Sequence, residues 1–326
     1  MLKLKYLFEN YALAKEALKN WKHDEANLDE TLSGFRISSN AIYPFCEDGQ
    51  VCFLRLAPVE EKEERNVSGE LEFIRYLRGK GYPALEPVLS ITGKDCLKLS
   101  TEWGAYYAAV FRKVGGVPVE DTDMSGPVMR AYGKALGRLH ALSEAYEPRV
   151  KKWSHEEALD WIASALTEYG APEGVVFAQA ALRQELSALP ARRDTYGLVH
   201  YDFEPDNVFY SEETQTCSVI DFDDGMYHWF ALDIEQVFDS LRGALRGEAL
   251  LKAKKEFIKG YEEERPYTEE MEASLPLMRR FVDLFSYARL IRCVAEKFPE
   301  EPPWLGELRI KLNRAILEKE RNILKA

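Results

Sequence analysis

The spacing of apolar residues predicts strands through the first third of the chain. Strand-like runs occupy five segments: 35–45, 50–58, 87–92, 95–103 and 105–114. The turn 47–49 contains an Asp-Gly pair, which is typical of a β-hairpin between two such runs. One helix is expected at 68–81, with Ser68 as its N-cap and Gly79 as its stop. The first 35 residues also show helical spacing.

The pattern becomes helical in the remainder of the chain. Apolar residues recur every three or four positions in 125–146 and 154–166, and two or three more long helices are expected after residue 247. Ser154 and Glu157 form the capping-box pattern that starts a helix.

These patterns predict an α+β fold of two lobes. The first lobe, residues 1–114, would be a small antiparallel sheet with one main helix, and the second, residues 115–326, would be larger and mostly helical. The clear strand pair of the second lobe is formed by 207–210 and 217–221. We place the hinge between the lobes at about 111–117.

Composition and charge narrow the functional classes. With 326 residues, 46% of them hydrophobic, the chain can bury a sizeable core. Its 55 acidic residues against 43 lysines and arginines give a formal net charge of −12, which argues against nonspecific nucleic-acid binding. The five cysteines form no C-x-x-C pair, and no apolar run approaches the roughly 20 residues of a membrane span. We therefore expect a cytoplasmic protein whose partners include neither nucleic acid nor membrane.

Acidic residues surround the strand pair of the second lobe. We expect the two runs to form a hairpin in which Tyr210 pairs with Ser218. In that register Asn207 lies opposite Asp221. Asp202 precedes Asn207 by five residues, so the intervening loop can fold its carboxylate toward the same point. Three oxygen-bearing side chains therefore converge at the open end of the hairpin.

This convergence suits phosphoryl transfer. Mg²⁺ prefers oxygen ligands, and an amide oxygen beside a carboxylate suits a Mg²⁺ that completes its shell with water and phosphates. A third carboxylate held off the metal can accept a proton from an attacking hydroxyl. Positioning, neutralisation of phosphate charge and one base are what the reaction requires.

Two motifs carry a resemblance to a known family. Residues 200–207, HYDFEPDN, fit H-x-D-x-x-x-x-N, and residues 220–223, IDFD, stand where protein kinases carry D-F-G. In detail the pattern resembles the aminoglycoside phosphotransferase and choline kinase superfamily, and the order of the lobes extends this resemblance over nearly the whole chain. The resemblance implies a bilobal protein-kinase-like fold and an enzyme that uses ATP and Mg²⁺.

The resemblance also implies roles for five residues of the second lobe. Asp202 matches the catalytic base, and Asn207 and Asp221 match the metal ligands. His200 matches the residue that supports the catalytic loop. Asp233 matches a buried aspartate that ties this loop to the following helix.

In the first lobe, the resemblance implies a clamp on the nucleotide phosphates. Arg55 stands where protein kinases and antibiotic kinases carry lysine. Arginine keeps the charge and can hold phosphate oxygens through two bonds. Glu70 matches the family's helix glutamate, and Glu72 remains an alternative because the sequence alone leaves the register open.

The remaining nucleotide contacts are assigned to two short segments. Residues 111–114 match the hinge against which adenine hydrogen-bonds, which makes Phe111, Arg112 and Val114 candidates. Ser39 and Asn40 stand in place of a glycine-rich nucleotide loop, and such a turn can offer backbone N–H groups to phosphate.

Candidates for substrate contacts lie beside the motifs. The acidic ones, which favour an amine-bearing alcohol, are Glu204, Asp206, Asp223 and Asp224. Trp229 belongs to an aromatic cluster that either forms a wall for a substrate cation or packs beneath the preceding loop. His140 lies on an apolar helix face and is interpreted as a core histidine.

The leading hypothesis is a kinase that phosphorylates a hydroxyl of a small molecule, namely an amino alcohol, an aminoglycoside, homoserine or a sugar-like acceptor. A nucleotide-binding pseudokinase scaffold and an atypical protein kinase are the alternatives. Asp233 follows Asp221 by only twelve residues, which leaves little chain for the peptide-docking segment of a protein kinase.

Overall fold

The computed structural model describes residues 2–298 and 300–325. Contacts between residues divide the chain into two compact units. The first unit extends to Gly115 and includes Pro148–Lys151, and the second comprises Gly116–Glu147 and the chain from Lys152 onward. The chain mixes helices with antiparallel sheets, so the predicted α+β class is confirmed.

The first unit contains a six-stranded antiparallel sheet. Its strands are β1 Arg36–Ile37, β2 Ala41–Glu47, β3 Gln50–Pro58, β4 Glu86–Val88, β5 Cys96–Thr101 and β6 Gly104–Arg112. They follow the order β1-β2-β3-β6-β4, and β5 also pairs with β6. The helices of this unit are η1 Leu4–Tyr6, α1 Tyr11–Leu18, α2 Leu28–Leu32, η2 Val59–Glu61 and α3 Glu64–Gly79.

The predicted hairpin of the first unit is confirmed. Glu47 pairs with Gln50, and the two turn residues, Asp48 and Gly49, have φ angles of 51° and 73°. Positive φ at both positions is the signature of the type I′ turn that an Asp-Gly pair favours. The run 35–45, in contrast, is not one strand, because it folds back on itself as β1 and β2.

The helix predicted at 68–81 was wrong in its start. The α3 helix begins at Glu64, one turn before the expected cap at Ser68. Val67 is buried and extends the apolar stripe of Leu71 and Ile74 toward the N-terminus, which accounts for the earlier start. The helical spacing of the first 35 residues corresponds to the short helices η1, α1 and α2, and Asn27 adopts a left-handed φ of 58° just before α2.

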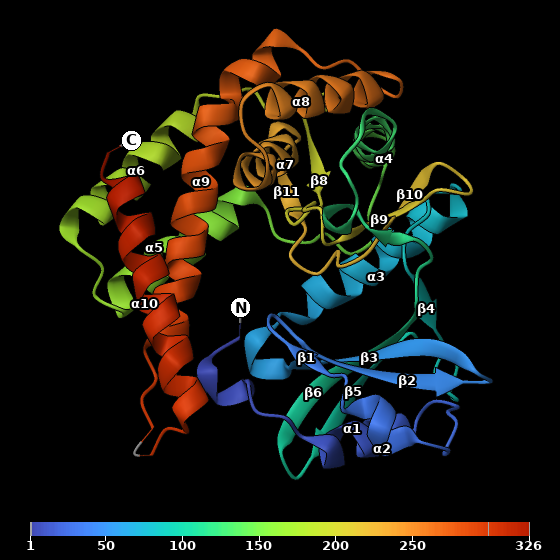
Figure 1. Ribbon diagram of the computed structural model, residues 1–326. Helices are drawn as coiled ribbons and strands as arrows, with labels where there is room; N and C mark the ends of the chain where they lie inside the picture. Colours follow the sequence, from blue (N-terminus) through green and yellow to red (C-terminus); the bar gives the residue numbers. More distant parts are fainter. Residues whose placement is uncertain (1, 299, 326) are drawn as a thin grey trace. The chain divides into compact units, whose positions relative to one another are not determined.

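The sheet of the first unit is covered on both faces. Helices α1 and α2 lie on one face and α3 lies on the other (Figure 1). Leu18 and Trp21 pack with Leu54 and Leu56 of β3 in one hydrophobic cluster. Because side chains alternate along a strand, the intervening Arg55 points to the α3 face.

The second unit is mainly helical. Its helices are η3 Val119–Asp121, α4 Gly126–Glu144, α5 His155–Glu168, α6 Glu173–Ser187, α7 Ala231–Ala244, α8 Gly247–Glu262, α9 Glu269–Val294 and α10 Pro303–Ile323. The expected capping box of α5 and the expected long helices after residue 247 are confirmed. No helix among the described residues is long and apolar enough to cross a membrane.

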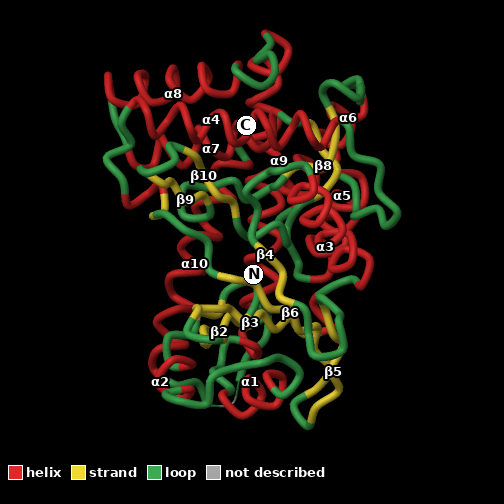
Figure 2. The backbone as a smooth tube through the Cα atoms, turned by 90° about the vertical axis from the view of Figure 1, so that its right-hand side faces the viewer, coloured by secondary structure: helices red, strands yellow, loops and turns green. Residues whose placement is uncertain are grey.

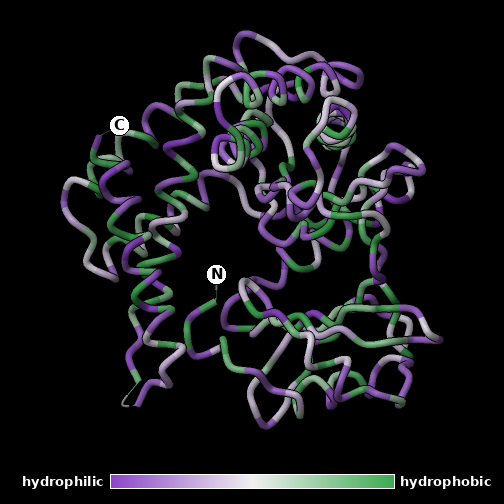
Figure 3. Tube along the Cα trace, in the orientation of Figure 1, coloured by the Kyte–Doolittle hydropathy of each residue, from purple (hydrophilic) through white to green (hydrophobic). Residues whose placement is uncertain are grey.

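Short strands connect the helices of the second unit. They are β7 Val117–Pro118, β8 Tyr196–Val199, β9 Val208–Ser211, β10 Thr216–Val219 and β11 Met226–Trp229. The hairpin of β9 and β10 was expected, but the antiparallel pair of β8 and β11 was not. Green and purple segments alternate along α9 and α10, as expected of helices with one buried side (Figure 3).

Helices α4 and α8 pack unusually closely (Figure 2). Gly133 and Gly137 of α4 face the backbone of α8, and Gly260 of α8 faces the backbone of α4. A Cβ at Gly133 would overlap the carbonyl oxygen of Phe257, and a Cβ at Gly260 would overlap that of Arg130. Glycine is therefore required at these crossings for steric reasons.

Gly133→Ala is expected to lower the free energy of unfolding by about 3 kcal/mol, because the two helix backbones must separate to admit the methyl group. Gly243→Ala on α7 is the matched control, since a Cβ there meets no atom within 4 Å. Alanine should stabilise that helix by up to about 1 kcal/mol. Urea unfolding of both variants measures the difference, and equal stabilities would contradict the close packing.

Candidate active site

The hairpin of β9 and β10 is formed, but in a different register from the expected one. Tyr210 pairs with Cys217, and Val208 pairs with Val219. The expected pairing of Tyr210 with Ser218 was therefore wrong by one residue. In the observed register all four of the paired residues just named are buried, so the hydrophobic core selects it.

The register places the two expected metal ligands next to each other. Asn207 lies opposite Ile220, whose N–H donates to the Asn207 carbonyl at 3.0 Å. Asp221 follows immediately and has a left-handed φ of 62°. This unusual backbone conformation ends the strand and turns the chain at the residue that carries the carboxylate.

Asp202 joins this pair through Asn207. The amide nitrogen Nδ2 of Asn207 donates to the carbonyl oxygen and to Oδ2 of Asp202, both at 3.0 Å. With Nδ2 used in this way, the other end of the amide presents Oδ1, which is a suitable metal ligand. The three side chains expected to converge are therefore brought together within one unit.

His200 connects two loops: residues 200–207, which the motif predicts to be the catalytic loop, and the loop that carries Asp221. Its Nε2 donates to the Ile220 carbonyl at 2.9 Å, and its Nδ1 accepts the N–H of Asp202 at 3.2 Å. Burial lowers the pKa of His200 to about 4, so the ring is neutral at physiological pH. A neutral ring with one donor and one acceptor satisfies both contacts.

Asp233 binds the backbone at the start of the loop 200–207. Its carboxylate accepts the N–H groups of His200 at 2.9 Å and Tyr201 at 2.8 Å, and it contacts Nε2 of His140 at 3.0 Å. His140 also contacts the hydroxyl of Tyr261 at 3.0 Å, which confirms the interpretation of His140 as a satisfied core histidine. Tyr201 has a φ of 68°, which is costly for a tyrosine. The hydrogen bond from its N–H to Asp233 stabilises this conformation.

The unexpected pair of β8 and β11 brings the loop of Asp202 and the loop of Asp221 to the same end of a two-stranded ribbon. Val199 at the end of β8 pairs with Met226 at the start of β11. His200 therefore follows β8 at the same end where the loop of Asp221 enters β11. Gly225 permits this approach, because a Cβ there would lie 2.9 Å from the Val199 carbonyl oxygen.

The cluster carries excess negative charge. Burial raises the pKa of Asp202 well above its usual range, and the nearby Asp221, Asp224 and Glu204 raise it further. Arg289 of α9 opposes this shift and forms an ion pair with Asp224 at 2.7 Å. A divalent cation at Asn207 and Asp221 would act in the same direction as Arg289.

Two cationic residues of the site were missed by sequence reasoning. Arg289 is one of several arginines on a long helix, and Lys152 lies in a segment that contains no motif. The Lys152 ammonium donates to the carbonyl oxygens of Phe222 at 3.1 Å and Asp223 at 2.7 Å. Neither residue has a local sequence signal, because its partners lie far away along the chain.

The candidate substrate residues do not all lie in one place. Glu204 lies in the catalytic loop, and burial together with Asp206 and Asp239 raises its pKa. Asp223 contributes its carbonyl to Lys152, as described above. Trp229 is 5% exposed, and its indole N–H donates to the Pro190 carbonyl at 3.2 Å. It packs on His155 and Tyr196, so the packing interpretation, and not the substrate wall, describes Trp229.

The two residues expected to form the phosphate clamp, Arg55 and Glu70, are paired within the first unit. Both terminal nitrogens of Arg55 donate to the carboxylate of Glu70 at 2.7 Å, and both side chains are buried. Arg55 also stacks over Phe111 at 4.9 Å. Glu72 instead accepts the backbone N–H groups of Arg149 and Val150. The structure thus pairs Arg55 with Glu70 and not with Glu72.

The other expected nucleotide contacts lie at strand ends. Ser39 and Asn40 belong to the turn between β1 and β2, where the Ser38 N–H donates to the Asn40 carbonyl. Phe111 and Arg112 are strand residues of β6, and Val114 follows that strand. The Arg112 side chain bonds Gln50 and Glu47, so it ties the hairpin of β2 and β3 together.

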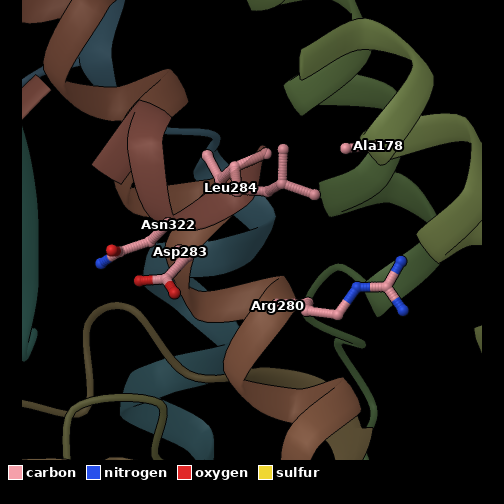
Figure 4. A pocket seen from close by; sticks show the side chains of 6 residues that line it. Ala178, Arg280, Asp283, Leu284 and Asn322 are labelled. Atoms are coloured by element: carbon pink, nitrogen blue, oxygen red, sulfur yellow. The ribbon is translucent and has the colours of Figure 1, made fainter. Parts of the chain in front are cut away.

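Three cavities of the described chain lie away from these residues. Figure 4 shows one of about 10 Å³ between α6, α9 and α10, lined by Arg280, Asp283 and Asn322 among others. That volume holds about one water molecule. Two others have volumes of about 420 Å³ each. One lies in the first unit and is lined by residues of the N-terminal segment, and the other lies in the second unit along α4 and α8. No predicted site residue lines any of the three.

Comparison with known proteins decides the family. The model of the phosphotransferase enzyme family matches residues 38–267, which is more than half of the chain. The chain belongs to the phosphotransferase enzyme family. The resemblance inferred from the two motifs is therefore confirmed, and with it the expectation of an enzyme.

Relatives of this phosphotransferase include small-molecule kinases. An amicoumacin kinase of Bacillus subtilis is 28% identical over 67% of this chain and 68% of the relative. A homoserine kinase of Caulobacter vibrioides is 24% identical over 67% of this chain and 69% of the relative. These names give no support to the pseudokinase alternative.

Solved structures show that the phosphotransferase has the fold of such kinases. An amicoumacin kinase in complex with AMP-PNP, Ca²⁺ and Ami matches with a TM-score of 0.80 and 24% identity, over 99% of this chain and 95% of the other. A microcompartment-associated aminopropanol kinase matches with a TM-score of 0.71 and 19% identity, over 97% and 95% of the two chains. The predicted bilobal kinase-like fold class is confirmed.

The buried histidines of the second unit predict a pH dependence of stability. Burial and the neighbouring His155 hold the pKa of His228 well below its ordinary value of 6.5. The unfolded chain therefore binds a proton below about pH 6.5 that the folded chain refuses, so the wild type loses stability as the pH falls.

His228→Phe should remove this contribution while keeping a ring against Phe281. Between about pH 7.5 and about pH 5.5, the wild type should lose about 1.4 kcal/mol of unfolding free energy more than the variant. Urea unfolding at both pH values measures this, and parallel losses in the two proteins would show that His228 is not held neutral.

Proposed function

We propose that this phosphotransferase is a kinase that uses ATP and a divalent cation to phosphorylate a hydroxyl of a small, amine-bearing molecule. The observation that carries the proposal is the convergence of Asp202, Asn207 and Asp221 on one point. A base, an amide oxygen and a metal-binding carboxylate are the groups that phosphoryl transfer needs.

The residues present fit a divalent cation and its nucleotide. Among residues 2–298 and 300–325, no group of three His, Cys, Asp or Glu side chains is arranged as a metal cage. Mg²⁺ often binds through one or two protein oxygens and completes its shell with water and phosphate. Asn207 Oδ1 and the Asp221 carboxylate supply such a pair. A bound cation would neutralise phosphate charge, and Arg55 is the residue of this chain that we assign to the phosphate oxygens.

Asp202 acts on the acceptor. The acceptor hydroxyl gives its proton to the Asp202 carboxylate as its oxygen forms a bond to the terminal phosphorus of ATP. The bond from that phosphorus to the bridging oxygen breaks, and ADP leaves with the electron pair. Asn207 orients Asp202 through the bond to Oδ2, so the base is aligned before the acceptor arrives.

The surrounding charge supports an acceptor with an amine. Glu204 and Asp206 lie in the catalytic loop, and the charge of Asp206 contributes to the raised pKa of Glu204. An ammonium group placed beside these carboxylates would relieve their mutual repulsion. Homoserine and aminopropanol, which name two of the related kinases, each contain a hydroxyl and an amine.

Asp202→Asn is expected to lower kcat by about 10²- to 10⁴-fold, because an amide cannot accept the proton. The assay measures ADP formation with MgATP and a panel of homoserine, 1-amino-2-propanol, aminoglycosides, amicoumacin and sugars. Propane-1,2-diol serves as the amine-free partner of 1-amino-2-propanol, and it should be the poorer acceptor.

Glu212→Gln in the exposed hairpin loop is the control for this change, and its activity should equal that of the wild type. Equal activity of the wild type and Asp202→Asn on the best acceptor would exclude Asp202 as the base. A preference for the diol would exclude recognition of the amine.

Substitution of the two glutamates of α3 separates their roles. Glu70→Ala leaves the buried Arg55 without its partner and should cost about 3–5 kcal/mol of unfolding free energy. Glu72→Ala removes two bonds to backbone N–H groups and should cost about 1–2 kcal/mol. Only Glu70→Ala should also raise the KM for ATP, as measured in the same ADP assay. If only Glu72→Ala raised the KM for ATP, the assignment of the clamp to Glu70 would be wrong.

A further inference from the structure

A buried lysine supports the backbone that follows Asp221. Lys152 is only 2% exposed, although lysine is rarely buried without a partner. Its ammonium donates to the carbonyl oxygens of Phe222 at 3.1 Å and Asp223 at 2.7 Å. These are the two residues immediately after the expected metal ligand.

The main chain around Lys152 is anchored independently of its side chain. The Tyr227 N–H donates to the Trp153 carbonyl at 2.9 Å, and Ser154 forms a parallel bridge with Tyr227. The segment from Lys152 to Ser154 therefore runs beside β11, while the ammonium reaches back to the loop that precedes β11. The backbone of this segment is therefore fixed by its bonds to β11, and the lysine side chain extends from it to the loop.

The second contact of this loop comes from His200. The ring of Phe222 lies against the His200 ring at 4.7 Å, and His200 Nε2 donates to the carbonyl of Ile220. One carbonyl group before Asp221 and two after it are thus held, those of Ile220, Phe222 and Asp223. Asp221 lies between them with its left-handed φ of 62°.

Burial of a lysine is costly where the aim is only to fill the core. An ammonium group loses its hydration when buried, and a methionine of similar length would pack with less loss. Carbonyl groups hold a cation more tightly than a neutral donor. The choice of lysine is explained if the direction of these carbonyls, and therefore of Asp221, matters.

We propose that Lys152 is a positioning residue for Asp221, which orients the metal-binding carboxylate by holding the carbonyls of Phe222 and Asp223. This inference rests on the proposed function, in which Asp221 binds the divalent cation. Lys152 contacts neither substrate nor nucleotide in this role and acts through the loop backbone.

The test compares nucleotide binding with and without the cation. Calorimetric titration with AMP-PNP, in Mg²⁺ and in EDTA, gives the factor by which Mg²⁺ strengthens binding. Lys152→Met keeps the length of the side chain and removes every donor, and it should reduce that factor about tenfold or more. Affinity in EDTA should stay unchanged, because Arg55 and Glu70 are untouched.

Lys151→Met is the matched control, since Lys151 is the exposed neighbour, and it should behave as the wild type. Lys152→Gln retains a neutral donor and should reduce the factor less than Lys152→Met does. If Lys152→Met does not fold, as judged by urea unfolding, Lys152→Gln carries the test with the same reading.

The outcomes separate the two claims. A folded Lys152 variant with the full Mg²⁺ factor, or with equal losses in Mg²⁺ and in EDTA, overturns the positioning role and leaves the proposed function standing. A wild type whose binding of AMP-PNP is not strengthened by Mg²⁺ overturns the cation site itself. A reduced factor in Lys152→Met, with binding in EDTA intact, supports the inference.

Discussion

The arrangement of the catalytic loop depends on one buried carboxylate, that of Asp233. It accepts the backbone N–H groups of His200 and Tyr201 and contacts the ring of His140, and it is fully buried. A buried carboxylate is stable only when hydrogen bonds replace its hydration. The bond to Tyr201 stabilises a left-handed backbone, and that turn sends Asp202 toward Asn207. Asp233 lies in the first turn of α7, where the helix dipole favours negative charge.

The second constraint is the concentration of acid around Asp202. Carboxylates that lie this close raise one another's pKa, so the cluster is stable only with cations nearby. The protein supplies two of them from distant parts of the chain, Arg289 to a side chain and Lys152 to the backbone. A divalent cation bound with the nucleotide would extend the same balance to Asp221. The folded loop and the proposed metal site thus both require cations that balance the charge of these carboxylates.

Local signals predicted much of the fold, and they failed where a local choice depends on distant packing. The turn at Asp48 and Gly49 and the capping box at Ser154 were predicted correctly, because each is decided by a few neighbouring residues. The register of β9 and β10 was wrong by one residue, since it is set by burial of alternate side chains against a core that the sequence does not display. The earlier start of α3 has the same cause, burial of Val67.

The sequence by itself determined which polar side chains converge in the second unit. The spacing of Asp202, Asn207 and Asp221 around a short hairpin is a local property, so their convergence followed from the motif even with the wrong register. Only the tertiary structure decided that Arg55 pairs with Glu70. Glu70 and Glu72 lie two residues apart on different sides of α3, and the sequence does not show which side meets the sheet. The tertiary structure also decided the positions of Lys152 and Arg289, whose partners lie about seventy residues away along the chain. Contacts between residues so far apart in the sequence leave no periodic or short-range pattern, and they form only when the chain folds.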